Sequence, residues 1–320
     1  MSFTDAFFAL RDEVRNWGRW GDDDRLGTLN LITDDAVAHA ASLVRTGRRV
    51  SCALDLKHSD GVQIGQMHGR INPLHAMVKI HSPDLGDADG KGMVAHFSDD
   101  IVTMPLQAAT HWDGLSHVSY DNTLYNGVPV SSINPMGGAT VLGIENVRHL
   151  TGRGVLLDVC AAKGLDRLPS DHEVTGEDLD EAAEHGGVTM RSGDIVLLRT
   201  GRIQVFREMG ALPYVTGPDS DGTSPGPGFD AVRWFWRNDV AAVADDTYIF
   251  EVFPGPSWDD ALGVHCLHVV DMGMTQGQNW DLEALAAACA EAGRYEFLLQ
   301  ANPEPFVGGC GSPVNPVAVL

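Results

Sequence analysis

Residues 110–117 read THWDGLSH and place His111, Asp113 and His117 within seven positions. Imidazole nitrogen together with carboxylate oxygen suits zinc, manganese or iron(II) better than calcium, which prefers oxygen ligands alone. The segment therefore indicates either a metal site or a turn that happens to hold polar side chains.

The backbone at the motif decides which side chains meet. In an extended segment, alternate side chains lie on one face, so His111 and Asp113 can reach one cation and Trp112 points away. His117 shares that face if the extension continues, and a bend at Gly114 would also bring it back. The HxDxxxH spacing alone does not decide between a metal site and a polar turn.

A second group of chemically useful residues lies in GVHCLHVVDMGMTQGQNWDL, residues 263–282. It contains His265, His268, Asp271 and Gln278. His268 alternates with apolar residues and fits a core histidine as well as a ligand, and the same holds for His265. Two histidine-bearing segments that are far apart in sequence are nevertheless what a folded metal site requires.

The elements that must position these residues are of both kinds, which predicts an α/β fold. Helices are expected after the capping residues Thr33 and Thr175 and in two later segments, namely 34–45, 177–186, 229–237 and 281–293. Strands are expected where branched apolar residues cluster or alternate, at 50–56, 154–159, 194–200 and 240–244. Residues 213–228, PYVTGPDSDGTSPGPG, are rich in proline and glycine and predict a long loop without regular structure, typical of an active-site lid.

Several blocks resemble the cyclase family, which contains bacterial kynurenine formamidases and isatin hydrolases. THWDGLSH resembles its His-x-Asp motif, and VHCLHVVDMGMTQGQNWDLEALA (264–286) resembles its C-terminal histidine block. Further blocks match in order and extend the resemblance over nearly the whole chain: WGRWGDDDRLGTLNLIT (17–33), GDIVLLRTG (193–201), PGPGFDAVRWFWRNDVAAVADDT (225–247) and CGSPVNPVAVL (310–320).

The resemblance implies a single domain over 1–320 with the family's swivelling β/β/α fold, an N-terminal extension at 1–33, and homodimers or homotetramers. It also implies a metal-dependent hydrolase that opens amide, formamide, cyclic amide or lactone bonds. His111 and Asp113 match the first two metal ligands. His117 matches a histidine that binds a second metal or serves catalysis, and His265 matches the later histidine.

Two departures from the family pattern bear on the metal. Many members have a metal-binding glutamate where this chain has Gln278, whose neutral carbonyl oxygen removes one charge from a dinuclear centre. Members similar to isatin hydrolase also carry glutamine and use a single manganese. We therefore expect one Mn²⁺ on His111, Asp113 and Gln278, with Zn²⁺ as the alternative. Many members also have a proline before the final histidine, where this chain has Gly114, Leu115 and Ser116, so the role of His117 depends on a different loop.

The expected chemistry assigns roles to the remaining residues. A divalent cation activates water and polarises the substrate carbonyl, and a neutral histidine carries the proton to the leaving group. His117 is the expected proton carrier and His265 the second catalytic residue. Trp112, Tyr120 and Tyr125 flank the motif and are expected to line the substrate pocket.

Composition narrows the partners. The 320 residues include 44 acidic and 22 basic side chains, a formal net charge of −22. Such a charge disfavours nucleic acid and anionic membrane surfaces, which leaves a small-molecule substrate. The segment MSFTDAFFALRDEVRNWGRW lacks a basic start and a cleavage site, and the five scattered cysteines form no CxxC pair, so a cytoplasmic protein is expected.

Alternatives remain at this stage. Amide and lactone hydrolysis need the same groups, a cyclase or dehydratase of natural-product assembly could use the same site, and a metal-binding protein without turnover is a further reading. The residues do not identify the substrate, the role of His268 or the number of metals and subunits.

Overall fold

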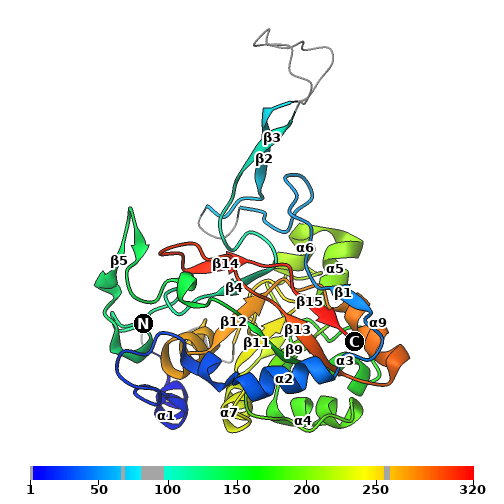
Figure 1. Cartoon of the computed structure of the whole chain (residues 1–320). Coiled ribbons are helices and arrows are strands. Elements are labelled where there is room, and N and C mark those ends of the chain that lie inside the picture. The colour runs from blue at the N-terminus through cyan, green and yellow to red at the C-terminus, as the bar shows by residue number, and fades with distance from the viewer. Residues whose placement is uncertain (1–2, 66–68, 81–96, 256–259) are drawn as a thin grey trace.

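A nine-stranded mixed sheet forms the centre of the computed structural model, which describes residues 3–65, 69–80, 97–255 and 260–320 (Figure 1). The strands occur in the order β1 (Arg49–Ser51), β15 (Val317–Val319), β13 (Glu296–Gln300), β7 (Thr151–Asp158), β9 (Ile195–Arg199), β11 (Ala242–Asp245), β12 (Thr275–Gln278), β4 (His111–Asp113) and β14 (Gly311–Pro313). The four strands β7, β9, β11 and β12 are parallel, and the outer strands pair antiparallel. The expected α/β class is confirmed.

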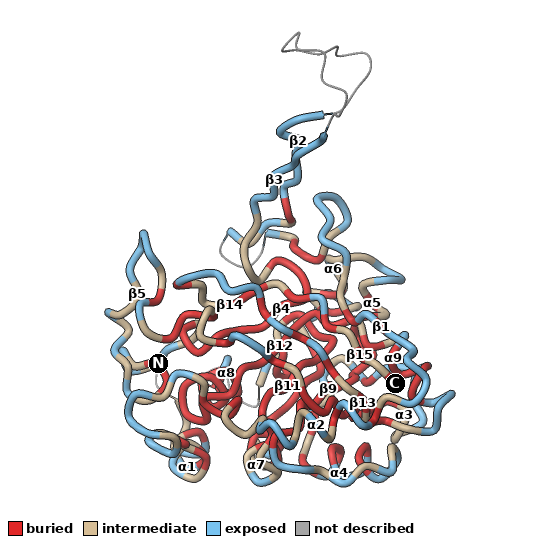
Figure 2. Tube along the Cα trace, in the orientation of Figure 1, coloured by how far each residue is buried: buried red, intermediate tan, exposed pale blue. Residues whose placement is uncertain are grey.

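Both faces of the parallel strands are buried, which explains their continuous apolar sequences. On β7, Val155 and Leu157 join one core with helices α1, α4 and α7, whereas Leu156 joins the other core with α9. Figure 2 shows this buried centre. The helices are α1 (Asp5–Val14), α2 (Asp34–Ser42), α3 (Val159–Ala162), α4 (Gly176–His185), α5 (Arg202–Met209), α6 (Ala211–Thr216), α7 (Phe229–Arg237), α8 (Gly263–His265) and α9 (Glu283–Ala292). A π-helix, η7 (Cys266–Met272), continues α8, and 3-10 turns lie at η1 (Gly27–Leu31), η3 (Tyr125–Gly127), η4 (Val130–Ser132) and η5 (Ile144–Asn146).

The cap residues that were read from the sequence act as expected. Thr33 caps α2, and Thr175 caps α4 in a reciprocal capping box with Asp178. Gly293 ends α9 in the left-handed conformation. The predicted strands at 154–159, 194–200 and 240–244 are confirmed as β7, β9 and β11, with shifts of a few residues at their ends.

Two predicted elements differ from the structure. The strand expected over 50–56 is confined to β1, because its partner β15 begins after Pro316, which has no N–H for the ladder. The loop expected at 213–228 contains the end of α6 and the two-residue strand β10 (Gly226–Pro227), which pairs with β8 (Glu173–Val174). Pro213 fits in α6 because it lies in the first helical turn, where backbone N–H groups have no helical partner.

The N-terminal segment packs against the block that carries the second group of histidines. Trp17 Nε1 donates to Val270 O at 2.7 Å, and the Thr28 backbone N–H donates to Gly273 O at 2.9 Å. Gly27 is required at this contact, because it has φ +59° and a Cβ there would lie 1.8 Å from Gly273 O. Residues 3–33 are thus joined to η7 by backbone contacts.

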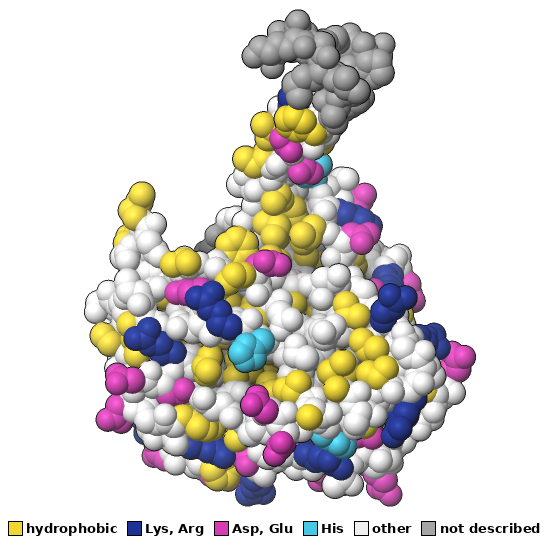
Figure 3. Space-filling model, in the orientation of Figure 1, with side chains coloured by type: hydrophobic (Ala, Val, Ile, Leu, Met, Phe, Trp, Pro, Cys, Tyr) yellow, Lys and Arg dark blue, Asp and Glu magenta, His cyan; other side chains and the backbone are white. Residues whose placement is uncertain are grey.

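A two-stranded arm, β2 (Leu74–Lys79) with β3 (Asp99–Thr103), projects from the body (Figure 1). Every residue of both strands is exposed. Apolar side chains are prominent on the arm in Figure 3. Val78, at 68% exposure, and Ile101, at 56%, belong to its strands. The strands β5 (Ile133–Asn134) and β6 (Gly138–Ala139) form a second, smaller hairpin.

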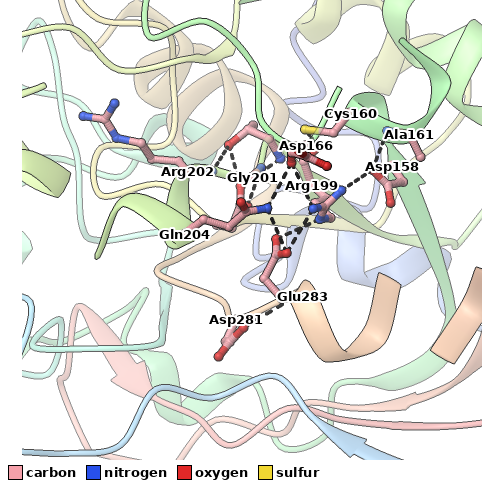
Figure 4. A network of polar contacts seen from close by, with 12 residues as sticks. Asp158, Cys160, Ala161, Asp166, Arg199, Gly201, Arg202, Gln204, Asp281 and Glu283 are labelled. Atoms are coloured by element: carbon pink, nitrogen blue, oxygen red, sulfur yellow. Dashed lines mark hydrogen bonds and ion pairs between the residues drawn. The ribbon is translucent and has the colours of Figure 1, made fainter. Parts of the chain in front are cut away.

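A polar network ties the carboxyl ends of β7 and β9 to α9 (Figure 4). Arg199 donates to Asp158 at 2.9 Å and to the two carboxylate oxygens of Glu283 at 2.8 and 3.0 Å. Gln204 donates to the same Glu283 carboxylate at 3.0 Å. These contacts satisfy the charges within the network, so it stabilises the edge of the sheet at which ligand sites of α/β folds occur.

Candidate functional site

His111 and Asp113 project from the same face of β4. Trp112 between them enters the opposite core and packs on Trp280, as the alternation of a strand requires. His111 Nδ1 donates to Ala109 O at 2.7 Å, which leaves Nε2 as an acceptor 3.4 Å from Asp113 Oδ1. Both Nε2 and Oδ1 are buried without a hydrogen-bond partner. Two buried acceptors that face each other are unfavourable unless a proton or a cation lies between them.

His117 returns to this pair through a turn. Its backbone N–H donates to Gly114 O at 2.9 Å, and its Nε2 lies 3.5 Å from Asp113 Oδ1. Gly114 packs tightly, since a Cβ there would lie 3.2 Å from Cys310 O. Of the two geometries considered from the sequence, the bend at Gly114 is therefore the one present. Burial lowers the pKa of His117 to about 4 despite the attraction of Asp113.

The second histidine block supplies His265 and Gln278 to the same place. Gln278, the last residue of β12, lies opposite His111 in the ladder. Its Nε2 is 2.9 Å from Asp113 Oδ2 and 2.9 Å from His265 Nε2. His265 Nδ1 donates to Glu251, whose carboxylate also accepts the His265 backbone N–H at 3.1 Å. Burial lowers the pKa of His265, but Glu251 and Asp113 outweigh burial and raise it.

Strained backbone accompanies these side chains. Asn279, directly after Gln278, has φ +59°, and Phe250, directly before Glu251, has φ +74°. Asn279 is held by hydrogen bonds from Thr110 to its carbonyl at 2.6 Å and from Tyr214 to its side chain at 2.9 Å. Non-glycine residues in this conformation cluster at functional sites, where surrounding contacts stabilise the strain.

Asp113 is the centre of the arrangement. Burial would raise the pKa of its carboxyl, but His117, His111 and His265 outweigh burial and hold that pKa below its ordinary value. The carboxylate is therefore charged at neutral pH and surrounded by imidazole nitrogens.

We tested whether these residues fit a metal ion. In the described ranges no group of three or more His, Cys, Asp and Glu side chains is arranged as a complete metal site. The facing atoms His111 Nε2 and Asp113 Oδ1 nevertheless suit a cation, because both offer lone pairs and neither has a partner. Gln278 presents its amide nitrogen to Asp113, whereas a ligand must present oxygen; half a turn of the amide exchanges the two atoms. The residues fit a metal as a partial set.

His268 and Asp271 do not join this group. His268 is fully buried between Phe235 and Phe250, with Nδ1 3.2 Å from Gln276 Oε1. Asp271 pairs with Arg15 at 2.6 Å. His268 thus has the surroundings of a core histidine, one of the two readings that the sequence left open.

The aromatic residues expected in the substrate pocket need a correction. Trp112 and Tyr125 are fully buried, with Trp112 Nε1 donating to Ala301 O at 2.8 Å and the Tyr125 hydroxyl donating to Asp24 at 2.9 Å. Neither ring has accessible surface that a substrate could contact, because each is packed in a core cluster. Tyr120 is half-buried, and its hydroxyl contacts Asp271 at 2.9 Å rather than the His111–Asp113 pair.

Two residues at the site were missed in the sequence. The sequence assigned no role to Glu251, because no local spacing connects it with His265. Arg70 lies with Nη2 3.5 Å from His117 Nε2, and no motif in its neighbourhood indicates this contact. For Glu251, the segment DDTYIFE (245–251) offers a sign, because it places an acidic residue next to apolar ones.

The comparisons with known proteins identify the family. A family described as "Putative cyclase" matches residues 35–252, more than half of the chain. The chain belongs to the cyclase family. The cyclase block that carries THWDGLSH lies within the match, while the second histidine block follows it. No curated protein sequence matches this cyclase-family chain.

Solved structures show the same fold. A crystal structure of a novel cyclase is 38% identical, with TM-score 0.87, and the alignment covers 97% of this chain and 99% of that one. Isatin hydrolase A from Labrenzia aggregata, bound to benzyl benzoate, is 18% identical with TM-score 0.62, covering 87% and 94%. A predicted metal-dependent hydrolase from Bacillus stearothermophilus is 12% identical with TM-score 0.52, covering 85% and 97%. The expected single α/β domain of the family's swivelling β/β/α type is confirmed.

The five cysteines are free. Four are buried, and burial raises the pKa of each of their thiols: Cys52, Cys160, Cys266 and Cys289. Cys310 is half-buried, and its carbonyl accepts the Gly114 backbone N–H at 2.9 Å. Among the described residues, no helix is long and apolar enough to span a membrane.

Proposed function

We propose that this chain is a metal-dependent hydrolase that opens an amide, a cyclic amide or imide, or a formamide bond. The observation that carries the proposal is the pair of buried, unpartnered acceptors, His111 Nε2 and Asp113 Oδ1, 3.4 Å apart. Membership of the cyclase family and the hydrolases among the structural neighbours support the reaction class.

His111, Asp113 and the Gln278 amide oxygen would hold one divalent ion, with Mn²⁺ favoured over Zn²⁺ because glutamine adds no charge. When bound, such an ion supplies Lewis acidity toward water and a carbonyl oxygen. Asp113 contributes a negative charge that its buried histidine neighbours maintain. Gln278 donates to Asp113 in its present orientation and would reverse its amide to serve as a ligand.

His117 is the proposed proton carrier. Its lowered pKa keeps it neutral near neutral pH, so Nε2 can accept a proton from the attacking water and return it to the leaving nitrogen. His117 is also partly accessible, with 18% of its side chain exposed, whereas His111 is completely buried. A group that exchanges protons with a substrate needs such access.

His265 would act from the opposite side of Asp113. Glu251 binds its Nδ1–H and thereby fixes the tautomer and the ring plane, so that Nε2 faces Gln278. This role is to position Gln278 and Asp113 rather than to meet the substrate.

Lactone hydrolysis is the nearest alternative, since it uses the same groups with oxygen as the leaving atom. A natural-product cyclase or dehydratase, and a metal-binding protein without turnover, are the further alternatives. The proposal also includes a homodimer or homotetramer, supported by the exposed apolar arm, and a cytoplasmic location, supported by the free thiols.

The deciding experiment is metal analysis of protein purified without chelator or nickel resin, beside His111→Ala and, as a matched control, His149→Ala at a histidine without a role in the site. We expect about one manganese per chain, retained in the control and lost in His111→Ala. The loaded protein is then assayed with isatin, an N-formyl aromatic amine and a lactone, together with His117→Asn.

The outcomes separate the readings. Loss of turnover with metal retained in His117→Asn supports the proposed hydrolase. Metal binding without turnover on any of these substrates favours the alternative of a metal-binding protein without activity. Failure to take up either Mn²⁺ or Zn²⁺ would refute the proposed metal site. About two zinc ions would mean that Gln278 does not limit the number of metals.

A further inference from the structure

Arg70 places a positive charge at the candidate site. The chain has 44 acidic side chains against 22 basic ones, and most arginines of the body form ion pairs. Among the residues that the structure describes, Arg70 forms no ion pair, and its Nη2 lies 3.5 Å from His117 Nε2. A half-buried guanidinium that is left unpaired in so acidic a protein is available for an anion from outside the chain.

Hydrogen bonds between Gln63 and Asn72 fix the position of the segment next to Arg70. Asn72 binds both backbone groups of Gln63, accepting from its N–H at 3.0 Å and donating to its carbonyl at 3.0 Å. The Gln63 side chain in turn donates to Ala108 O at 2.9 Å and accepts the Tyr248 hydroxyl at 2.8 Å. These bonds attach the ends of the loop to the segment that leads into β4, so Arg70 is positioned relative to the His111–His117 turn.

The position of Arg70 places its charge beside the reacting groups. His117 Nε2 lies 3.5 Å from Arg70 Nη2 and 3.5 Å from Asp113 Oδ1. The charge of Arg70 also opposes the rise in the pKa of His265 and of Tyr248. An anion held there would sit next to the proposed proton carrier.

We propose that Arg70 binds the oxygen of the scissile carbonyl as it becomes negatively charged, and then binds the carboxylate of the acid product. The inference rests on the proposed hydrolysis. In that reaction the water oxygen forms the new C–O bond and the C=O electron pair moves onto the carbonyl oxygen. When the C–N bond breaks, that pair re-forms the C=O bond and the nitrogen leaves with a proton. Arg70 pairs with the transient charge and takes no part in the bond changes.

The test separates Arg70 from the proposed function by measuring binding of benzoate, a simple carboxylate, to Mn²⁺-loaded protein by calorimetry. Arg70→Met is compared with Arg70→Lys and with Arg45→Met, which removes the same charge from an exposed residue outside the site. We expect benzoate affinity to fall about 10- to 100-fold in Arg70→Met, to recover in part in Arg70→Lys and to stay unchanged in Arg45→Met. Manganese content and thermal stability of all variants should match the parent.

Kinetics with a neutral cyclic amide complete the test. The charge forms after binding, so Arg70→Met should lower kcat far more than it raises KM. Equal benzoate affinity in Arg70→Met and the parent overturns the inference. If Arg70→Met loses manganese together with kcat, the inference is also overturned, because Arg70 would then serve to retain the metal. If the parent binds manganese and benzoate but hydrolyses nothing, the proposed function fails while carboxylate binding by Arg70 is still measured.

Discussion

At the scale of single residues, the site is built around one charged carboxylate. Asp113 is completely buried and meets three histidines and an amide, each from a different direction. Leaving such a carboxylate without compensation would cost several kcal/mol in a protein interior. The surrounding histidines hold the pKa of the Asp113 carboxyl below its ordinary value, in addition to any chemistry they perform.

The contact between Glu251 and His265 predicts that removing the Glu251 charge reduces metal affinity or turnover. Glu251→Gln keeps an acceptor for the His265 Nδ1–H but removes the negative charge that fixes the tautomer. We expect a roughly 10- to 100-fold reduction in metal affinity or turnover. Manganese titration and kinetics measure it, with the exposed Glu177→Gln as the control of equal charge change. Unchanged values in Glu251→Gln would mean that the carboxylate has a packing role only.

His268 predicts a pH dependence of stability. Burial lowers its folded-state pKa to about 3, from an ordinary value of 6.5 in the unfolded chain. Between these values the unfolded chain binds the extra proton, so this contribution to the free energy of unfolding is present above pH 6.5 and is lost as the pH falls toward 3. The loss amounts to about 1.4 kcal/mol per pH unit within that window.

His268→Asn should therefore reduce the fall in stability between about pH 6.5 and pH 5 by about 2 kcal/mol. Urea unfolding of both proteins in chelator, at each pH, measures the difference without a contribution from metal release. Parallel pH profiles for parent and variant would show that His268 is protonated in the folded state.

At the scale of elements, segments from opposite ends of the chain meet at η7. The N-terminal segment reaches it through Gly27, whose missing side chain allows contact with Gly273. Gly273 has φ +67° and is equally confined, since a Cβ there would lie 2.3 Å from the Tyr125 ring. Gly27 and Gly273 thus lie in contacts with backbone and with an aromatic ring that leave no room for a methyl group.

This contact predicts different costs for two similar substitutions. Gly27→Ala and Gly47→Ala both place alanine in the left-handed region, with φ +59° and +70°, but a Cβ at Gly47 meets nothing within 4 Å. We expect Gly47→Ala to lower the free energy of unfolding by about 1 to 2 kcal/mol and Gly27→Ala to lower it by at least about 1 to 3 kcal/mol more. Equal costs in urea unfolding would contradict the close contact.

Comparison of sequence and structure shows where local rules suffice. Thr175 and Gly293 fix helix ends through their own hydrogen bonds and dihedrals, and the sequence predicted the Thr175 cap and a helix over 281–293. The approach of His265 to Asp113 follows from strand order, which no local pattern contains, and only the family resemblance indicated it. Glu251 and Arg70 were missed because each lies in irregular backbone, where the spacing of residues does not predict the direction in which a side chain points.

At the scale of the whole molecule, the exposed arm is the feature that the body does not explain. A two-stranded hairpin is at most marginally stable in water by itself. Among the described residues, β2 and β3 pair only with each other, so the outer edge of each strand has no partner there. In a symmetric dimer, the arm of each subunit would pack against the arm of the other and cover its exposed surface, because the same patch occurs on both subunits.

We therefore expect the chain to form a homodimer or a larger even-numbered oligomer through the arm. Ile101→Lys and Val78→Lys place charges on it and should shift sedimentation toward the monomer. Met136→Lys is the matched control, because Met136 is 96% exposed and lies outside the arm. A monomeric parent, or an oligomer that all three variants preserve, would count against the arm as the interface.

The arrangement of the thiols makes the turn of the metal motif open to direct observation. A maleimide dye should modify Cys310 well before the four cysteines that are buried with raised pKa values. Because the Cys310 carbonyl holds the Gly114 N–H, that dye would sit beside the bend that returns His117 to Asp113. A fluorescent label attached to the natural sequence, with no engineered cysteine, would then report movements of that bend when a cation or a carboxylate is added.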